Sequence, residues 1–180
     1  TDCFRMYEMF LGPLQDSKPW DTKGIVGVSK FLRKFWSLFY NQDGTWLGTS
    51  AEPTKDELKI LHTAIKKVNL DIENFSFNTC IAHFMVATNE LKKSNCTKIA
   101  ILKPLLVLMA PFAPFITEQL WQDMNQTGSV HRDASYPVHN ESYLIEASIQ
   151  YPVCINGKKR AVAHVDANAS KEVIESLALS

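Results

Sequence analysis

Residues 99–121 read IAILKPLLVLMAPFAPFITEQLW, and this stretch decides the fold. From Ile99 to Met109 the chain is apolar on nearly every side of a helix, which predicts the central helix of a helical bundle. Pro104 should kink that helix or mark its true start. Pro111 interrupts the pattern, and Pro114 suits the first turn of a following helix. That helix is predicted to carry four residues inward: Phe115, Ile116, Leu120 and Trp121.

Three amphipathic helices are predicted upstream of this stretch. One runs from about Asp21, a natural N-cap, to about Asn41, with an inward stripe of Ile25, Val28, Leu32, Phe35, Trp36 and Phe39. Another begins at Thr54, where Thr54-x-x-Glu57 has capping-box spacing, and buries Leu58, Leu61, Ile65, Val68 and Ile72. A third begins near Ser76, with Phe77, Cys80, Ile81, Phe84, Thr88 and Leu91 inward. Short connections between such helices predict antiparallel neighbours in a bundle.

The opening residues 1–20, TDCFRMYEMFLGPLQDSKPW, start inside a helical pattern. Phe4, Tyr7 and Leu11 fall at helical spacing, and Gly12-Pro13 breaks the helix. Because the chain has no initiating methionine and begins within this pattern, we interpret residues 1–20 as a connector in a larger protein. The predicted bundle then covers residues 21–126.

The character of the chain changes after the bundle. Residues 127–142 are polar and rich in turn formers, which predicts a linker or long loop. A strand is predicted where apolar residues alternate with polar or small ones, at Ile149, Tyr151, Val153 and Ile155. Asn156-Gly157 then predicts a hairpin turn. A return strand over about 158–165 and a helix from near Ser170 are predicted to follow. Two strands and a helix do not normally close a core, so residues 143–180 are expected to be the truncated start of a further domain. The predicted fold class is therefore mainly α: an antiparallel helical bundle followed by a short α+β segment.

Composition narrows the function classes. The 180 residues contain 19 basic and 19 acidic side chains and have zero formal net charge. Since dedicated nucleic-acid-binding domains are usually strongly basic, any RNA contact must come from a local face. No apolar run reaches the roughly 18 residues of a membrane span, and no secretory signal is present. Cys3, Cys80, Cys96 and Cys154 have no C-x-x-C spacing and are interpreted as reduced residues of a cytosolic protein.

No residue pattern predicts catalysis or metal binding. The five histidines have no metal-ligand spacing, and none sits in a recognisable nucleophile motif. No glycine-rich phosphate loop is present among the 7 glycines. His83 lies on the shoulder of its helix and is interpreted as a packing residue. Trp36 and Trp121 fall on apolar stripes and should be core, whereas Trp20 and Trp46 lie in loops and remain open as base-stacking candidates.

One side of the helix over residues 21–41 is the better candidate for a binding surface. Lys23, Lys30, Arg33 and Lys34 fall opposite its apolar stripe, where they could neutralise phosphates. On the residues alone, an ordinary solvated helix face is the favoured interpretation of this basic face. A second basic spot, which includes Lys158 and Arg160, follows the predicted hairpin turn and is a weaker candidate.

Several motifs resemble one family of enzymes. Arg5-x-Tyr7-x-Met9-Phe10-x-Gly12-Pro13-Leu14 and Ser17-Lys18-Pro19-Trp20 resemble the segment after the catalytic domain of bacterial-type leucyl-tRNA synthetases. The segments FLRKFWSLF (31–39), FNTCIAHFM (77–85), LMAPFAPFITEQLW (108–121), GSVH (128–131) and VCINGKKRA (153–161) resemble later motifs of that family in the same order. This chain has Phe115 where the family usually has histidine, and Ala161 where it usually has glycine.

The resemblance implies a bundle of the class I anticodon-binding kind, followed by the start of a C-terminal domain. It implies a cytoplasmic parent enzyme that uses ATP, with magnesium, to activate leucine and attach it to its tRNA. The implied partners are the leucine-accepting tRNA and the upstream catalytic and editing domains of the same chain. No membrane association is implied. The residues expected to contact the tRNA backbone are then Lys23, Lys30, Arg33, Lys34, Lys158 and Arg160. These 180 residues alone should be inactive and hold no cofactor. Two alternatives stay open: another class I synthetase, or a helical protein-interaction module, which would show an exposed apolar patch.

Overall fold

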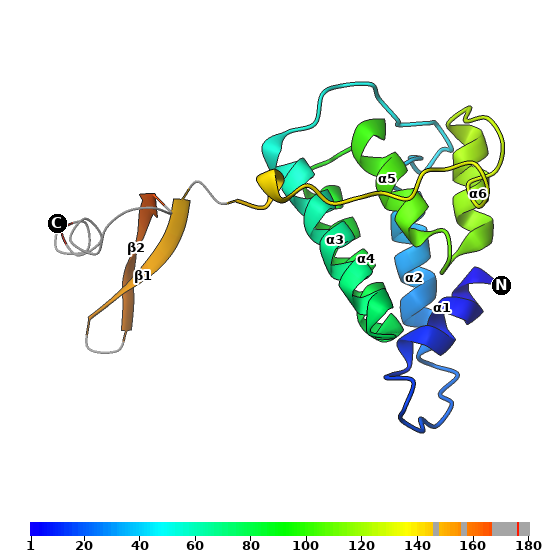
Figure 1. Cartoon of the computed structure of the whole chain (residues 1–180), viewed down its shortest axis with the longest axis horizontal. Helices are drawn as coiled ribbons and strands as arrows, with labels where there is room; N and C mark the ends of the chain where they lie inside the picture. Colours follow the sequence, from blue (N-terminus) through cyan, green and yellow to red (C-terminus); the bar gives the residue numbers. More distant parts are fainter. Residues whose placement is uncertain (146–147, 156–157, 167–175, 177–180) are drawn as a thin grey trace. The chain divides into compact units, whose positions relative to one another are not determined.

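The computed structural model describes residues 1–145, 148–155, 158–166 and 176. It divides into two compact units, Thr1–Tyr143 and Leu144–Ser180, and each is described by itself. The first unit is a bundle of α-helices that ends in a short 3₁₀-helix (Figure 1). Its elements are α1 (Asp2–Phe10), α2 (Ile25–Trp36), α3 (Lys55–Glu73), α4 (Phe77–Lys93), α5 (Ile99–Met109), α6 (Pro114–Asp123) and η1 (Glu141–Tyr143). In the described residues, no helix is long and apolar enough to cross a membrane.

Helix α5 is the centre of the hydrophobic core, as its apolar sequence predicted. All five residues from Leu105 to Met109 are buried, and Ile101 and Leu102 are fully covered. The helix begins at Ile99, so Pro104 lies inside it and does not mark its start. Burial of this apolar surface contributes to the hydrophobic core that stabilises the bundle.

Helices α3 and α4 form an antiparallel pair joined by a short turn, with Phe75 in the left-handed region at φ 55° (Figure 1). The capping box predicted at the start of α3 is present. Thr54 Oγ1 accepts from the Glu57 N–H at 3.3 Å, and Glu57 Oε2 accepts from the Thr54 N–H at 2.7 Å. These bonds satisfy N–H groups that the first turn of a helix leaves without partners.

Glu57 also ties α3 to the start of α5. Its carboxylate accepts a 2.6 Å hydrogen bond from the Lys98 ammonium, and its side chain is only 4% exposed. Burial alone raises the pKa of Glu57. The hydrogen bonds from Lys98 and Thr54 more than offset that effect and lower the pKa to about 2. The contact is therefore an ionised pair in the native protein.

Helix α1 buries Met6 and Tyr7. Of the three residues at helical spacing, Tyr7 is buried and Leu11 is half-buried, whereas Phe4 is 48% exposed and lies beside Trp20. Asp2 is also buried, and its carboxylate accepts the N–H groups of Phe115 (3.1 Å) and Ile116 (2.7 Å). Asp2 thus caps the N-terminus of α6 from a distant part of the chain.

Helix α2 is shorter than predicted at both ends. The Asp21 carboxylate accepts the Lys23 N–H at 2.9 Å and so caps a preceding turn, and the helix begins only at Ile25. It ends at Trp36 because the next residues form tighter i→i−3 bonds and then turn, with Phe39 O accepting from Leu47 N at 2.8 Å. The predicted stripe is largely correct: Val28, Leu32, Phe35 and Phe39 are buried, and Ile25 and Trp36 are half-buried.

Helix α6 begins with Pro114 in its first turn, as predicted. The prediction of its inward residues was wrong at one position. Leu120 and Trp121 are buried and Ile116 is half-buried, whereas Phe115 is 64% exposed. Thr117 takes the inward position, and its hydroxyl donates to the Ala113 carbonyl at 2.8 Å.

Residues 127–142, which were expected to be a linker, lie along the bundle; Figure 1 shows them as an irregular yellow segment that crosses the helices. Val130 is buried, and its N–H donates to the Glu118 carboxylate on α6 at 3.0 Å. Further along, the Tyr136 hydroxyl donates to Asn69 of α3 at 3.0 Å, and Glu141 pairs with Lys66 of α3 at 2.9 Å. This segment therefore belongs to the packed surface of the first unit.

The second unit contains strands β1 (Ser148–Ile155) and β2 (Lys158–Asp166), at the positions that the alternating pattern predicted. They pair antiparallel, with Ile149 opposite Val165 and an irregularity between Val153 and Cys154. The predicted Asn156-Gly157 turn and the helix from near Ser170 lie outside the described residues.

Candidate nucleic-acid interface

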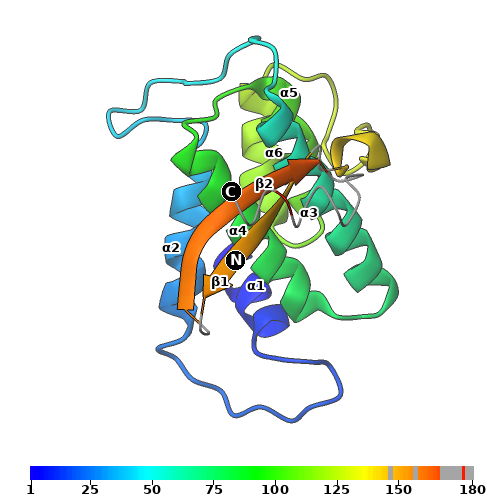
Figure 2. The ribbon, with the colours of Figure 1, turned by 90° about the vertical axis from the view of Figure 1, so that its left-hand side faces the viewer.

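The four cations of the basic face (Lys23, Lys30, Arg33 and Lys34) are all exposed. Lys30, Arg33 and Lys34 project from α2, and Lys23 lies in the turn before it. Packing of the opposite stripe into the core forces them outward. The chain has no acidic residue between Asp21 and Asp43, so no carboxylate on this segment neutralises them. Figure 2 shows α2 along one side of the bundle.

The charges of the basic face have no carboxylate partner among the described residues, in contrast to several other lysines of the bundle. Elsewhere, Lys66, Lys93 and Lys98 pair with Glu141, Glu90 and Glu57 at 2.9, 2.6 and 2.6 Å. Across the residues that the structure describes, no ion pair involves Lys23, Lys30, Arg33 or Lys34. Three such cations on one side of a helix, with a fourth in the turn before it, can bind a polyanion without first breaking an internal ion pair.

The end of α2 stabilises two of these cations. Arg33 and Lys34 occupy its last turn, where positive charge is favourable beside the partial negative charge of the helix C-terminus. Lys92 of α4 adds a third cation at this end, since its ammonium donates to the Ser37 carbonyl at 2.8 Å. Arg33 offers a planar fork for bidentate phosphate contact, whereas the lysines act as point charges.

The other predicted candidates, Lys158 and Arg160, belong to the second unit. Both lie on β2, two positions apart, and Arg160 is exposed. Arg160 has no partner in the register, because Val153 pairs with Ala161 and Cys154 with Lys159. The two candidates are far along the chain from the four cations of the basic face.

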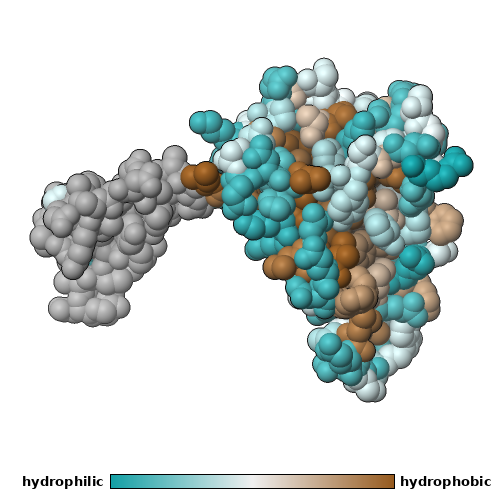
Figure 3. Space-filling view, viewed as in Figure 1, coloured by the Kyte–Doolittle hydropathy of each residue, from teal (hydrophilic) through white to brown (hydrophobic). Residues whose placement is uncertain are grey.

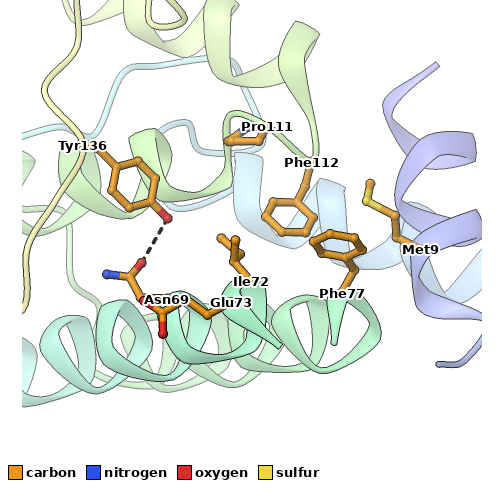
Figure 4. Close-up of a pocket in the computed structure, with 8 residues that line it drawn as sticks. All are labelled: Met9, Asn69, Ile72, Glu73, Phe77, Pro111, Phe112 and Tyr136. Atoms are coloured by element: carbon orange, nitrogen blue, oxygen red, sulfur yellow. Dashed lines mark hydrogen bonds between the residues drawn. The ribbon is translucent and has the colours of Figure 1, made fainter. Parts of the chain in front are cut away.

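An apolar pocket of about 600 Å³ is a feature that the sequence did not indicate (Figure 4). Its walls come from α1, α3, the start of α4, the α5–α6 turn and the segment that crosses the bundle. The lining residues are Met9, Asn69, Ile72, Glu73, Phe77, Pro111, Phe112 and Tyr136. Because each of these elements contributes only one to three side chains, no local motif could have revealed it.

The pocket contains few groups that could act in catalysis. Figure 4 shows the Tyr136 hydroxyl bonded to Asn69 on one side and the rings of Phe77 and Phe112 facing the cavity with Met9 on the other. Glu73 is its only titratable carboxylate, and no serine, cysteine or histidine lines it. The bundle also exposes Phe75 and Phe115, and Figure 3 shows apolar side chains among hydrophilic ones on one face. Some apolar surface is thus exposed on the bundle.

The remaining polar candidates lie apart from the basic face. His83 Nε2 lies 3.1 Å from Asp71 Oδ2, and its interpretation as a packing histidine stays a prediction. No group of three or more potential metal ligands occurs among the described residues. Trp121 is buried and the half-buried Trp36 stacks on Tyr40. Of the two loop tryptophans, Trp46 packs on Phe39 and Tyr40, and Trp20 is 48% exposed against Tyr7.

Comparisons with known proteins agree with this architecture. Residues 55–175 match the family of anticodon-binding domains of tRNA ligases. Over its whole length the chain is 54% identical to a leucine–tRNA ligase of Porphyromonas gingivalis and 52% identical to that of Parabacteroides distasonis, and it spans 19% of each. A crystal structure of Agrobacterium radiobacter K84 agnB2 LeuRS in a ternary complex with tRNA and LeuAMS superposes with a TM-score of 0.77. That match has 29% sequence identity and covers 99% of this chain and 25% of the other.

The helical bundle therefore has the fold of a tRNA ligase region, and the chain belongs to the anticodon-binding domain family of tRNA ligases. The curated relatives reported above, which match its full length, are leucine–tRNA ligases.

Proposed function

We propose that this chain is the tRNA-supporting region of a leucine–tRNA ligase, and that the basic face of α2 binds the tRNA backbone. The observation that carries the proposal is the set of four exposed cations on α2 and its preceding turn, which form no ion pair within the described residues. Membership of the anticodon-binding domain family supports RNA as the polyanion.

The composition of this face favours phosphate contacts over base recognition. The rings of Phe31 and Phe35 on α2 are buried, and Trp36 stacks on Tyr40, so exposed rings for base stacking are not provided by this helix. Lysine and arginine side chains that reach phosphates fix the register of an RNA without reading its sequence. The proposed role is therefore to support the body of the tRNA. Lys158 and Arg160 on β2 are proposed as a second backbone contact.

The test removes two adjacent charges from the complete ligase. In the double variant Arg33→Ala, Lys34→Ala, tRNA affinity should fall, and the dependence of log Kd on log salt should become shallower by roughly 1.4 to 1.8 for two lost contacts. The control is Lys55→Ala, Lys67→Ala, which removes two exposed cations of α3 that form no ion pair within the described residues. An unchanged salt slope in the α2 variant, with the fold intact, would return this surface to an ordinary solvated helix face.

The wider activity rests on regions that the relatives have beyond this chain. The proposed ligase activates leucine with ATP and magnesium in the cytoplasm and transfers it to its tRNA, and the chain by itself is proposed to be inactive. The sequence supports this division because it contains no phosphate-binding loop. Leucine-dependent pyrophosphate exchange by the purified 180-residue chain, above a control without protein, would refute the proposed inactivity.

A further inference from the structure

Two glycines lie on or beside the start of α2, and only one has a reason within the bundle. Gly24 is required by packing, because a Cβ there would lie 2.6 Å from the Tyr7 hydroxyl and 2.9 Å from its ring. Gly27 has nothing within 4 Å of the position that a Cβ would occupy. Its backbone is ordinary right-handed helix, so conformation does not demand glycine either.

Glycine is an unfavourable choice at such a position. It loses more conformational entropy on folding than alanine and lowers helix stability. No contact with the described residues would be lost by adding a methyl group at Gly27, and none is gained by omitting it. What glycine provides is open space above the helix backbone, which permits another backbone to approach closely.

The neighbours of Gly27 define what could approach. Lys30 lies one turn further along the same side of α2, and Lys34 lies about 20° away in projection after two turns. Lys23 precedes Gly27 by about one turn, and Val26 beside it is 51% exposed. Gly27 is therefore an open position, without a side chain, on a surface bordered by cations that form no ion pair within the described residues.

We propose that Gly27 is a contact point at which a phosphate–ribose backbone of tRNA lies directly on α2, held between Lys23 and Lys30. This inference rests on the proposed function and adds the position and closeness of the contact. The charge of the border selects the occupant, since a segment with four cations and no carboxylate from residue 22 to residue 42 matches a polyanion better than a neutral protein surface.

The test adds bulk at Gly27 without changing charge. Alanine and leucine are both strong helix formers, so Gly27→Ala and Gly27→Leu should keep the fold and raise the melting temperature of the 180-residue chain by about 2 °C. In the complete ligase the tRNA Kd should rise progressively, by at least about tenfold for Gly27→Leu, which corresponds to one lost charge-assisted contact. The control is Val86→Leu, which adds bulk at an exposed position of α4 and should leave the Kd unchanged.

Charge and bulk variants separate this inference from the proposed function. If Arg33→Ala, Lys34→Ala weakens binding but Gly27→Leu does not, the basic face binds tRNA without close contact at Gly27, and the inference is overturned. If neither set changes the Kd, the proposed function of this face fails as well. A bulk variant that lowers the melting temperature would show that space at Gly27 serves folding, which also overturns the inference.

Discussion

The buried contact between Glu57 and Lys98 gives a pH-dependent prediction. Replacing Glu57 by glutamine preserves the size of the side chain but removes the charge that holds α3 and α5 together through the 2.6 Å contact. It also leaves the Lys98 ammonium, whose side chain is only 19% exposed, without its counter-charge. We expect Glu57→Gln to destabilise the chain at neutral pH.

The magnitude follows from the lowered pKa. A pKa of about 2 in the folded chain, against the ordinary value of 4.5, means that ionised Glu57 stabilises the native state. The difference corresponds to about 3 kcal/mol, and allowing for the solvent that reaches Lys98 we expect about 2–3 kcal/mol at pH 7. Because the pKa is depressed, this stability is present above about pH 4.5 and is lost as the pH falls toward 2. At pH 2 the wild type and Glu57→Gln should differ by less than about 1 kcal/mol.

Urea unfolding of both proteins from pH 7 to pH 2 measures the effect. The difference in free energy of unfolding isolates Glu57, because other carboxylates titrate in both proteins. The matched control is Glu90→Gln: Glu90 and Lys93 also lie 2.6 Å apart, but both side chains are exposed, and such pairs contribute about 0.5 kcal/mol or less. A wild-type–variant difference that stays constant from pH 7 to pH 2, or that equals the Glu90 control, would refute the reasoning.

Three further predictions concern packing and reactivity. Asp2→Ala should lower the free energy of unfolding by about 1–2 kcal/mol, because two N–H groups at the start of α6 lose their acceptor; urea unfolding measures this, and an unchanged midpoint would contradict it. Phe112→Ala should cost about 3–5 kcal/mol, whereas Phe115→Ala should stay within about 0.5 kcal/mol, since Phe112 is buried and Phe115 is 64% exposed. Equal losses in the same assay would show that Phe115 is packed. Iodoacetamide at pH 8 should label Cys3 in the native chain but not Cys80 or Cys96, because burial raises the pKa of the Cys80 thiol to about 12 and that of Cys96 to about 11. Peptide mass mapping measures the labelling, and a labelled Cys80 in the native chain would contradict the prediction.

Features set by neighbouring residues were predictable from the sequence. The capping box of Thr54 and Glu57 depends on a spacing of three residues, and the central position of α5 follows from a run that is apolar on nearly every side. The outward direction of the basic face also followed from a local pattern, because the stripe on the other side of α2 has to face the core. What these exposed cations bind stays a prediction.

Features set by distant contacts were not predictable. Asp2 reaches the N–H groups of Phe115 and Ile116 on α6, and nothing near Asp2 in the sequence indicates those partners. The exposure of Phe115 and the burial of Thr117 depend on how α6 packs against other helices, which its own sequence does not show. The apolar pocket and the packing of residues 127–142 on the bundle likewise arise from the assembly of several elements.

The cap that Asp2 provides has a consequence for the order of events during synthesis. The amide groups that Asp2 binds are made 113 and 114 residues later, and the Pro111 carbonyl that accepts from Arg5 is made 106 residues later. Until then the Asp2 carboxylate and the Arg5 guanidinium lack these partners, whereas α1 as a whole already has α2 and α4 to pack against. On the ribosome, α1 can therefore join α2 and α4 before the start of α6 emerges. The cap on α6 forms only once α6 itself has been made.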